Sequence, residues 1–139
     1  KVWDGIDNVE EAYDQIEEKL NILPLKMGYM PDAIFFEDLL LSENYGVMSF
    51  KNQTKSLWIY DHKIKTEANG IQGSDRKKSL DSVYNPWLDE KIEVYQETSK
   101  TGRIRYSITI KTDEASYIVT GDIDKNEFLK VVEGLYINR

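Results

Sequence analysis

Oxygen-bearing side chains near the C-terminus have the spacing of a calcium-binding loop. Asp122, Asp124 and Asn126 alternate with other residues, and Glu133 follows Asp122 by eleven positions. An EF-hand loop supplies oxygen ligands at these positions, but it also needs glycine at its sixth position, where this chain has Glu127. We therefore interpret the segment as a capped helix start and predict no metal site.

The chain offers little for acid–base or nucleophilic catalysis. His62 is the only histidine, and the neighbouring Asp61 would point to the opposite face of a strand. A histidine that activates a nucleophile needs both the nucleophile and an orienting carboxylate within reach. Adjacent acids such as Glu10 and Glu11 are typical of solvated surface charge. We therefore predict that the protein is not an enzyme and uses no cofactor.

Aromatic side chains are the remaining candidates for a binding site. Five of them, Trp3, Trp58, Tyr60, Tyr84 and Trp87, could line a groove for a peptide, a glycan or a lipid. Aromatic residues within strands usually pack in the core, which is our interpretation for most of them. Trp3 and Trp87 lie outside the predicted elements. We predict these two, together with Tyr84, as ligand-binding residues.

Composition places the chain among folded proteins and excludes some functions. Its 139 residues are 40% hydrophobic and 31% charged, which predicts one domain spanning residues 1–139. The net charge of −7 argues against nucleic acid as a partner. The absence of cysteine excludes disulfides, thiolate metal sites and thiol catalysis, and it suits an exported domain.

The chain has no apolar run long enough to span a membrane, for which about 18 residues are needed. It begins at Lys1 rather than at methionine, so we interpret it as a fragment of a longer protein whose membrane anchor precedes it. The predicted location is extracytoplasmic, at the cell surface or attached to the membrane. Contact with the membrane is expected only through that anchor.

Helices are predicted at both ends of the chain. Asn8 to Leu20 has a capping residue, Asn8, and Glu11 three positions later, followed by an apolar stripe at helical spacing. Near the C-terminus, Asp124 and Glu127 have the spacing of a capping box. The buried stripe of this second helix is expected to consist of Phe128, Val131, Val132 and Leu135.

Strands are predicted between the helices. The strongest signal runs from Arg103 to Lys111, where Ile104, Tyr106, Ile108 and Ile110 alternate with polar residues. The other predicted strands are 33–41, 46–51, 56–62, 91–97 and 116–120, with hairpin loops at 52–55 and 98–102. The segment 65–85 is expected to be a surface excursion or an edge strand with a short helical turn. The predicted fold is α+β: an antiparallel meander of about six strands, with the N-terminal and C-terminal helices packed on it.

The run Arg105-Tyr-Ser-Ile-Thr-Ile110, followed by Ser116 to Leu135, resembles the ending of a bacterial domain family of unknown function. Leu23-Pro24, Gly28-Tyr29 and Pro31 resemble the entry to its first strand. Such domains occur outside the membrane, at the C-terminus of single-span proteins of Firmicutes, and some of these proteins are similar to anti-sigma factors. The matching residues are structural, so the resemblance implies a location and carries no site residue over.

These observations lead to two hypotheses about function. The first is a non-catalytic extracytoplasmic sensor or interaction domain of a membrane-anchored, signalling-type protein, with an unknown protein or envelope ligand as its partner. The alternative is a carrier that holds a lipid or another apolar ligand between sheet and helix. The first predicts a binding surface at aromatic residues, and the second predicts an apolar cavity inside the fold.

Overall fold

A computed structural model of the chain describes residues 8–64 and 78–137. This part of the chain contains two helices, α1 (Val9–Leu20) and α2 (Lys125–Glu133). It also contains nine strands: β1 (Leu25–Met27), β2 (Phe35–Leu41), β3 (Tyr45–Lys51), β4 (Ser56–Lys63), β5 (Lys78–Asn85), β6 (Glu90–Thr98), β7 (Ile104–Lys111), β8 (Ala115–Gly121) and β9 (Leu135–Ile137).

Seven strands form one antiparallel sheet in the order β2-β3-β4-β8-β7-β6-β5. The order contains two meanders, β2-β3-β4 and β5-β6-β7-β8, which join where β4 pairs with β8. β1 and β9 form a separate two-stranded sheet, in which Leu25 is opposite Ile137. Strands from the two ends of the chain are therefore held side by side.

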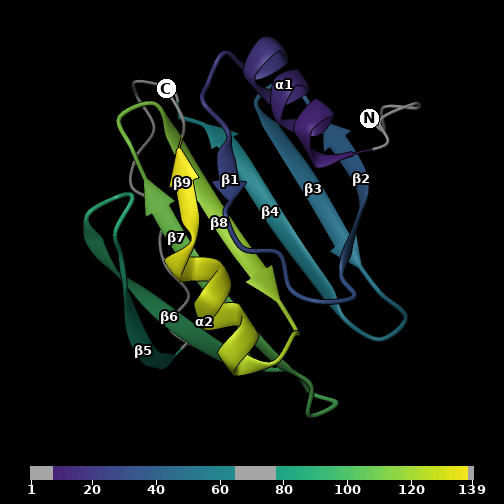
Figure 1. Ribbon diagram of the computed structural model, residues 1–139, viewed down its shortest axis with the longest axis vertical. Coiled ribbons are helices and arrows are strands. Elements are labelled where there is room, and N and C mark those ends of the chain that lie inside the picture. Colours follow the sequence, from purple (N-terminus) through teal and green to yellow (C-terminus); the bar gives the residue numbers. More distant parts are fainter. Residues whose placement is uncertain (1–7, 65–77, 138–139) are drawn as a thin grey trace.

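Both helices and the β1–β9 pair lie on the same face of the large sheet (Figure 1). α1 contacts β2 and β3, whereas α2 contacts β5 and β7. The apolar stripes of the helices cover the inward side chains of the strands, and these side chains form a continuous core. We call this side of the sheet the helix face and the opposite side the outer face.

The first helix begins as the sequence predicts. The Asn8 side chain accepts a hydrogen bond from the backbone N–H of Glu11 at 2.9 Å, which satisfies one of the free amides of the first turn. The helix ends at Asn21, which has a left-handed conformation with φ of 57°. The buried side chains of the helix are Ala12, Tyr13, Ile16 and Leu20, as the apolar stripe predicts.

The second helix is confirmed, but the predicted capping box is not. Asp124 occupies the N-cap position without a side-chain hydrogen bond to the backbone, and its carboxylate lies 3.7 Å from the Lys55 ammonium. Glu127 accepts a hydrogen bond from the Tyr29 hydroxyl at 2.7 Å, which raises the pKa of Tyr29 to about 12. Both side chains therefore interact with residues outside the helix and do not cap the backbone N–H groups of its first turn.

The apolar side chains of the strand Ile104–Lys111 pack in the core as predicted, with the exception of Ile104. Ile108 and Ile110 are buried, and the Tyr106 ring lies 5.7 Å from the Phe128 ring, so strand and helix share an interior. Ile104 is 42% exposed, although it lies in the same phase of the strand. Phe128, Val131, Val132 and Leu135 are fully buried, although Leu135 begins β9 rather than continuing the helix.

The predicted α+β class, with an antiparallel sheet and helices near both ends, is confirmed. β5 is an edge strand, which agrees with one of the two possibilities stated for the segment 65–85. Residues 65–77 lie outside the described part of the chain. The pair β1–β9 was not predicted, because three-residue strands have too few positions to show a periodic pattern.

Candidate functional site

An open cleft of about 710 Å³ lies on the helix face, at the end of the sheet where β7 turns into β8. Its walls come from the connection between α1 and β1, the turn after β5, the turn after β7, the strand β8 and the strand β9. The described lining residues are Leu23, Trp87, Leu88, Thr112, Asp113, Glu114, Tyr117 and Ile137.

The turn that carries Trp87 is fixed by a buried asparagine. The Asn85 amide donates hydrogen bonds to the carbonyl oxygens of Val132 and Leu135 at 2.7 and 2.8 Å, and its oxygen accepts the Leu88 N–H at 2.8 Å. Asn85 is fully buried, so these three bonds replace its contacts with water. The turn is thereby attached to the end of α2 and the start of β9.

Trp87 extends from this turn into the cleft. Its indole is 70% exposed, and its ring centre lies 5.9 Å from that of Tyr136 on β9. Burying an aromatic ring is strongly favourable, so a partner that covers this indole would gain binding free energy from it. The exposed indole is therefore the most informative feature of the cleft.

The opposite part of the lining is an acidic turn between β7 and β8. The Thr112 hydroxyl oxygen accepts the N–H groups of Glu114 and Ala115 at 3.3 and 3.1 Å, which fixes the turn locally. The Glu114 carbonyl accepts the Ile64 N–H at 2.9 Å, so the end of β4 also supports it. The carboxylates of Asp113 and Glu114 are exposed to solvent.

The inner wall of the cleft is formed by Tyr117 and Leu23. The Tyr117 hydroxyl donates to the Leu23 carbonyl oxygen, and its ring is 2% exposed. Burial raises the pKa of Tyr117 above its ordinary value, and the nearby carboxyl of Asp61 raises it further. Tyr117 therefore remains protonated and acts as a hydrogen-bond donor that holds the chain before β1.

Asp61 lies beneath β1, next to this inner wall. It is opposite Tyr117 in the β4–β8 pair, fully buried, and accepts the Leu25 N–H at 3.3 Å through Oδ2. Its Oδ1 has no hydrogen-bond partner among the described residues. Burial raises the pKa of Asp61 to about 8. The carboxyl group is thus largely neutral at pH 7. It holds β1 in place next to the inner wall of the cleft.

The lining combines apolar contacts with negative charge. Trp87, Leu88 and Ile137 provide apolar surface, whereas Asp113 and Glu114 provide two carboxylates. No lysine, arginine or histidine occurs among the described lining residues. A ligand that presents a cationic group next to an apolar group matches this surface in both respects.

The structure separates the three predicted ligand-binding residues. Trp87 lines the cleft, as described above. Tyr84 lies on the outer face, 54% exposed, and its hydroxyl donates to Asp89 at 2.5 Å, so it does not line the described cleft. That hydrogen bond raises the pKa of Tyr84. Trp3 lies outside the described residues.

Sequence reasoning missed the acidic turn and the two buried polar residues. Asp113 and Glu114 lie between two predicted strands, and nothing in the neighbouring sequence indicates which side chains they would meet. Asp61 had a usable signal, because it follows Leu57 and Ile59 in the inward phase of a strand. A polar residue at an inward strand position predicts a buried partner or a functional group.

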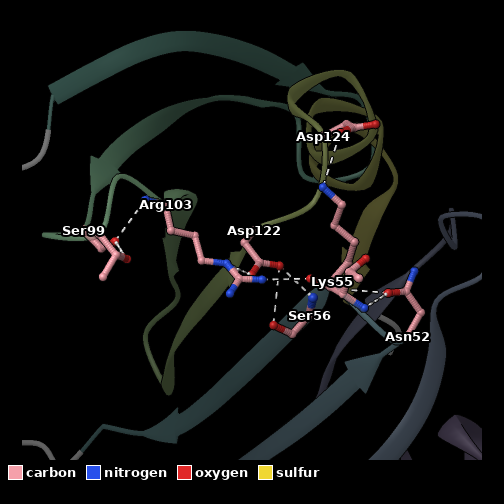
Figure 2. Close-up of polar contacts among 9 residues, drawn as sticks. Asn52, Lys55, Ser56, Ser99, Arg103, Asp122 and Asp124 are labelled. Carbon is pink, nitrogen blue, oxygen red and sulfur yellow. Dashed lines mark hydrogen bonds and ion pairs between the residues drawn. The ribbon is translucent and has the colours of Figure 1, made fainter.

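Asp122 and Asp124, the first two residues with calcium-loop spacing, have other partners (Figure 2). The Asp122 carboxylate accepts the Ser56 N–H at 2.7 Å and lies 2.8 Å from Nε of Arg103. Arg103 also donates to the Thr54 carbonyl oxygen at 2.8 Å. The cluster ties two hairpin loops to the chain segment between β8 and α2. No group of three metal-binding side chains occurs among residues 8–64 and 78–137.

No protein-family model matches the chain, and comparisons with curated proteins and with solved structures found no match either. The resemblance to a Firmicutes domain family therefore stays a prediction. Within the described residues, neither helix has the length and apolar character needed to cross a bilayer.

Proposed function

We propose that this chain is a non-catalytic interaction domain whose cleft binds a partner-protein segment carrying lysine or arginine beside apolar residues. The observation that carries the proposal is that the exposed indole of Trp87 and the acidic turn of Asp113 and Glu114 line one cleft. An indole face attracts both apolar groups and cations, and tryptophan is enriched among residues that dominate binding energies.

Electrostatics supports a cationic partner. The chain has a net charge of −7, and the described lining contributes carboxylates without basic residues. A negative field of this kind accelerates the approach of positive groups and disfavours negative ones. The contribution of these carboxylates to binding should weaken at high salt, because both are exposed to solvent.

The setting that we propose is extracytoplasmic, in a membrane-anchored protein of the signalling type. Its support is the resemblance of the segment from Arg105 to Leu135 to domains found there, together with the absence of cysteine. The test is the coding sequence on the N-terminal side of Lys1. A continuous apolar segment or an export signal is expected there, and a cytosolic protein without either would contradict this location.

We favour this function over the carrier of an apolar ligand. A carrier needs space between the helices and the sheet, and in this protein that layer consists of mutually packed, buried side chains. The cleft lies beside this layer, and its lining includes the exposed carboxylates of Asp113 and Glu114. Binding of a long-chain fatty acid with a stoichiometry of one would favour the carrier instead.

The test uses a fluorescent twelve-residue peptide of alternating lysine and leucine, compared with a glutamate–leucine peptide of the same length. Fluorescence anisotropy should detect binding of the first peptide and not of the second. Trp87→Ala should weaken binding by roughly 10-fold or more, the effect of losing an anchoring aromatic residue. Asp113→Asn combined with Glu114→Gln should weaken it and reduce its dependence on salt.

Two matched controls separate the cleft from general effects. Phe35→Ala removes a side chain that is also 70% exposed but lies on the edge strand β2. Asp14→Asn with Glu17→Gln removes the same charge from the exposed side of α1. Both variants should bind the peptide like the unmodified chain. Equal loss in the control and cleft variants would show that the peptide recognises net charge, and the proposal would be wrong.

A further inference from the structure

The outer face of the seven-stranded sheet carries a row of apolar side chains in register across four strands. Leu40 of β2 is opposite Val47 of β3, which is opposite Tyr60 of β4, which is opposite Ile118 of β8. Leu40, Tyr60 and Ile118 are each 37% exposed, and Val47 is half-buried. We call these four residues the apolar row. No described helix or strand covers it.

Further rings extend the row on both sides. Trp58 precedes Tyr60 on the same face and lies beneath the Arg105 guanidinium, 5.5 Å from the ring centre. On the other side Tyr45 stacks on His62, with ring centres 6.3 Å apart. The solvent side of an antiparallel sheet is ordinarily polar, so a face of this composition indicates a surface that becomes covered.

Charges of opposite sign border the apolar row. Glu37 and Asp38 lie on β2, at one side of the row, and the Glu37 carboxylate lies 3.3 Å from the ammonium of Lys51 on β3. Arg105 and Lys111 lie on β7, at the other side, and both are exposed, as are the two acids of β2. Asp38 on one side and the two cations Arg105 and Lys111 on the other therefore flank the apolar centre, along the direction that crosses the strands.

We propose that two copies of this chain pack through their outer faces, related by a two-fold axis that runs parallel to the strands at Tyr60. This axis places β2 of each copy over β7 of the other, because both strands are two positions from β4. Asp38 then meets the position of Ser107, two residues from Arg105, since the two share a row of the sheet. Asp38 of each copy is then within two residues of Arg105 of the other copy.

The apolar centres match under the same operation. Tyr60 meets its own symmetry copy, and Val47 of one chain meets Ile118 of the other. Such an interface is isologous, and stacked sheets of this kind lie about 10 Å apart. The two-fold axis thus buries the apolar row and pairs the charges with one rotation.

The area is sufficient for a specific but reversible dimer. Five strands about 4.8 Å apart and seven residues long give a face of roughly 24 by 24 Å on each copy. Both copies together would bury about 1,150 Å² in projection, which is close to the lower limit of stable protein interfaces. We therefore expect a dimer that dissociates on dilution.

Sedimentation velocity over a range of about 1 to 500 µM tests the proposal. The mass should rise with concentration from 16.2 kDa toward twice that value. Ile118→Lys should raise the dimer dissociation constant by roughly 30-fold or more, as expected for a residue near the centre of an interface. Ile104→Lys is the matched control, because Ile104 is 42% exposed and faces the other side of the sheet. It should leave the constant unchanged.

A charge exchange tests the register of the two copies. Asp38→Arg and Arg105→Asp should each weaken the dimer, and the double variant should recover much of the loss. Because the chain has no cysteine, Tyr60→Cys introduces a single reactive thiol in an otherwise unchanged surface. A short bis-maleimide should link two copies through this thiol, whereas Ile104→Cys should give no linked product.

Circular dichroism of each variant separates loss of association from loss of folding. A chain that stays monomeric at every concentration overturns the proposal. So does a dimer that Ile118→Lys leaves intact, or one that Ile104→Lys weakens equally. Since Trp87 lies on the helix face, Trp87→Ala should alter peptide binding and leave the dimer constant unchanged, which keeps this inference separate from the function of the cleft.

Discussion

The carboxyl group of Asp61 lies beneath β1 and accepts the backbone N–H of Leu25 at 3.3 Å. The next outward N–H of the same strand, that of Met27, is accepted by the Tyr13 hydroxyl at 3.0 Å. Because β1 pairs with β9 on its other edge, two side chains take the place of a further strand on this edge. The inner wall of the cleft therefore depends on a buried acid.

This burial predicts a pH dependence of stability. The pKa of Asp61 is about 8 in the folded chain and about 3.8 when the chain is unfolded. The folded state holds a proton that the unfolded state releases, so the stability contributed by this group is complete below pH 4 and is lost as the pH rises toward 8. The largest slope is about 1.4 kcal/mol per pH unit.

Asp61→Asn should remove that slope, because an amide keeps the acceptor for Leu25 and does not ionise. Urea unfolding at pH 5, 6, 7 and 8 should show the variant gaining stability relative to the unmodified chain as the pH rises. Asp14→Asn, which changes an exposed carboxylate on α1, should show no such trend. A difference between the chain and Asp61→Asn that is the same at all four pH values would contradict the raised pKa.

Asn85→Ala should both destabilise the fold and loosen the cleft. It leaves the carbonyl oxygens of Val132 and Leu135 and the Leu88 N–H without their partner, at a cost on the order of 3 kcal/mol. Asn126→Ala, at an exposed position on α2, should change the free energy of unfolding by less than about 0.5 kcal/mol. Peptide anisotropy should show weaker binding only for Asn85→Ala.

An equal effect of the two asparagine substitutions would indicate that Asn85 does not fix the turn. Asn85→Asp provides a further comparison, because it keeps the shape and replaces a donor by an acceptor. Its carboxylate would face two carbonyl oxygens, so it should destabilise at least as much as Asn85→Ala.

The periodic elements could be predicted because one face of each is buried. The alternation from Leu57 to Tyr60 indicated the strand β4, and the stripe of Phe128, Val131 and Val132 indicated α2. In such segments the local pattern follows directly from the layer that covers it. These elements form the scaffold on which the cleft is built.

The cleft itself could not be predicted beyond Trp87. Leu25 pairs with Ile137, more than a hundred residues later in the chain. The Asn85 side chain donates to the carbonyl oxygen of Val132, which is 47 residues later. Contacts of this kind depend on how the elements assemble, and nothing in the neighbouring sequence reports them. Gly121, the last residue of β8, is a further case, because its close approach to Leu57 is also a contact between distant parts of the chain.

The ion pair of Arg103 and Asp122 should contribute more than a surface pair. The Asp122 side chain is only 7% exposed, and Arg103 holds it at 2.8 Å while donating to the Thr54 carbonyl. Arg103→Met should lower the free energy of unfolding by about 1–2 kcal/mol, because a nearly buried carboxylate loses its cation. The measurement is urea unfolding at low and at moderate salt.

Lys51→Met is the matched control for this pair. Lys51 lies 3.3 Å from Glu37, and both side chains are 45% exposed. A pair of this exposure contributes less than about 1 kcal/mol, and salt reduces it further. If Lys51→Met and Arg103→Met have the same effect, the cluster in Figure 2 does not stabilise the loops more than ordinary surface charge does.

Gly121→Ala should destabilise the fold through a steric conflict. A methyl group at this position would lie 2.8 Å from the Ser56 carbonyl oxygen and 2.8 Å from Cδ1 of Leu57, and the backbone atom cannot move without disturbing the β4–β8 pair. Overpacking of this kind costs about 1–3 kcal/mol.

Gly102→Ala is the matched control. No atom lies within 4 Å of the new methyl group, and the only source of strain is the φ of 85° at this position. Its cost should be about 1 kcal/mol, and Gly102→Asn should recover part of it, since asparagine tolerates the left-handed conformation. Thermal unfolding should therefore rank Gly121→Ala below Gly102→Ala, and the reverse order would contradict the close approach of β8 to β4.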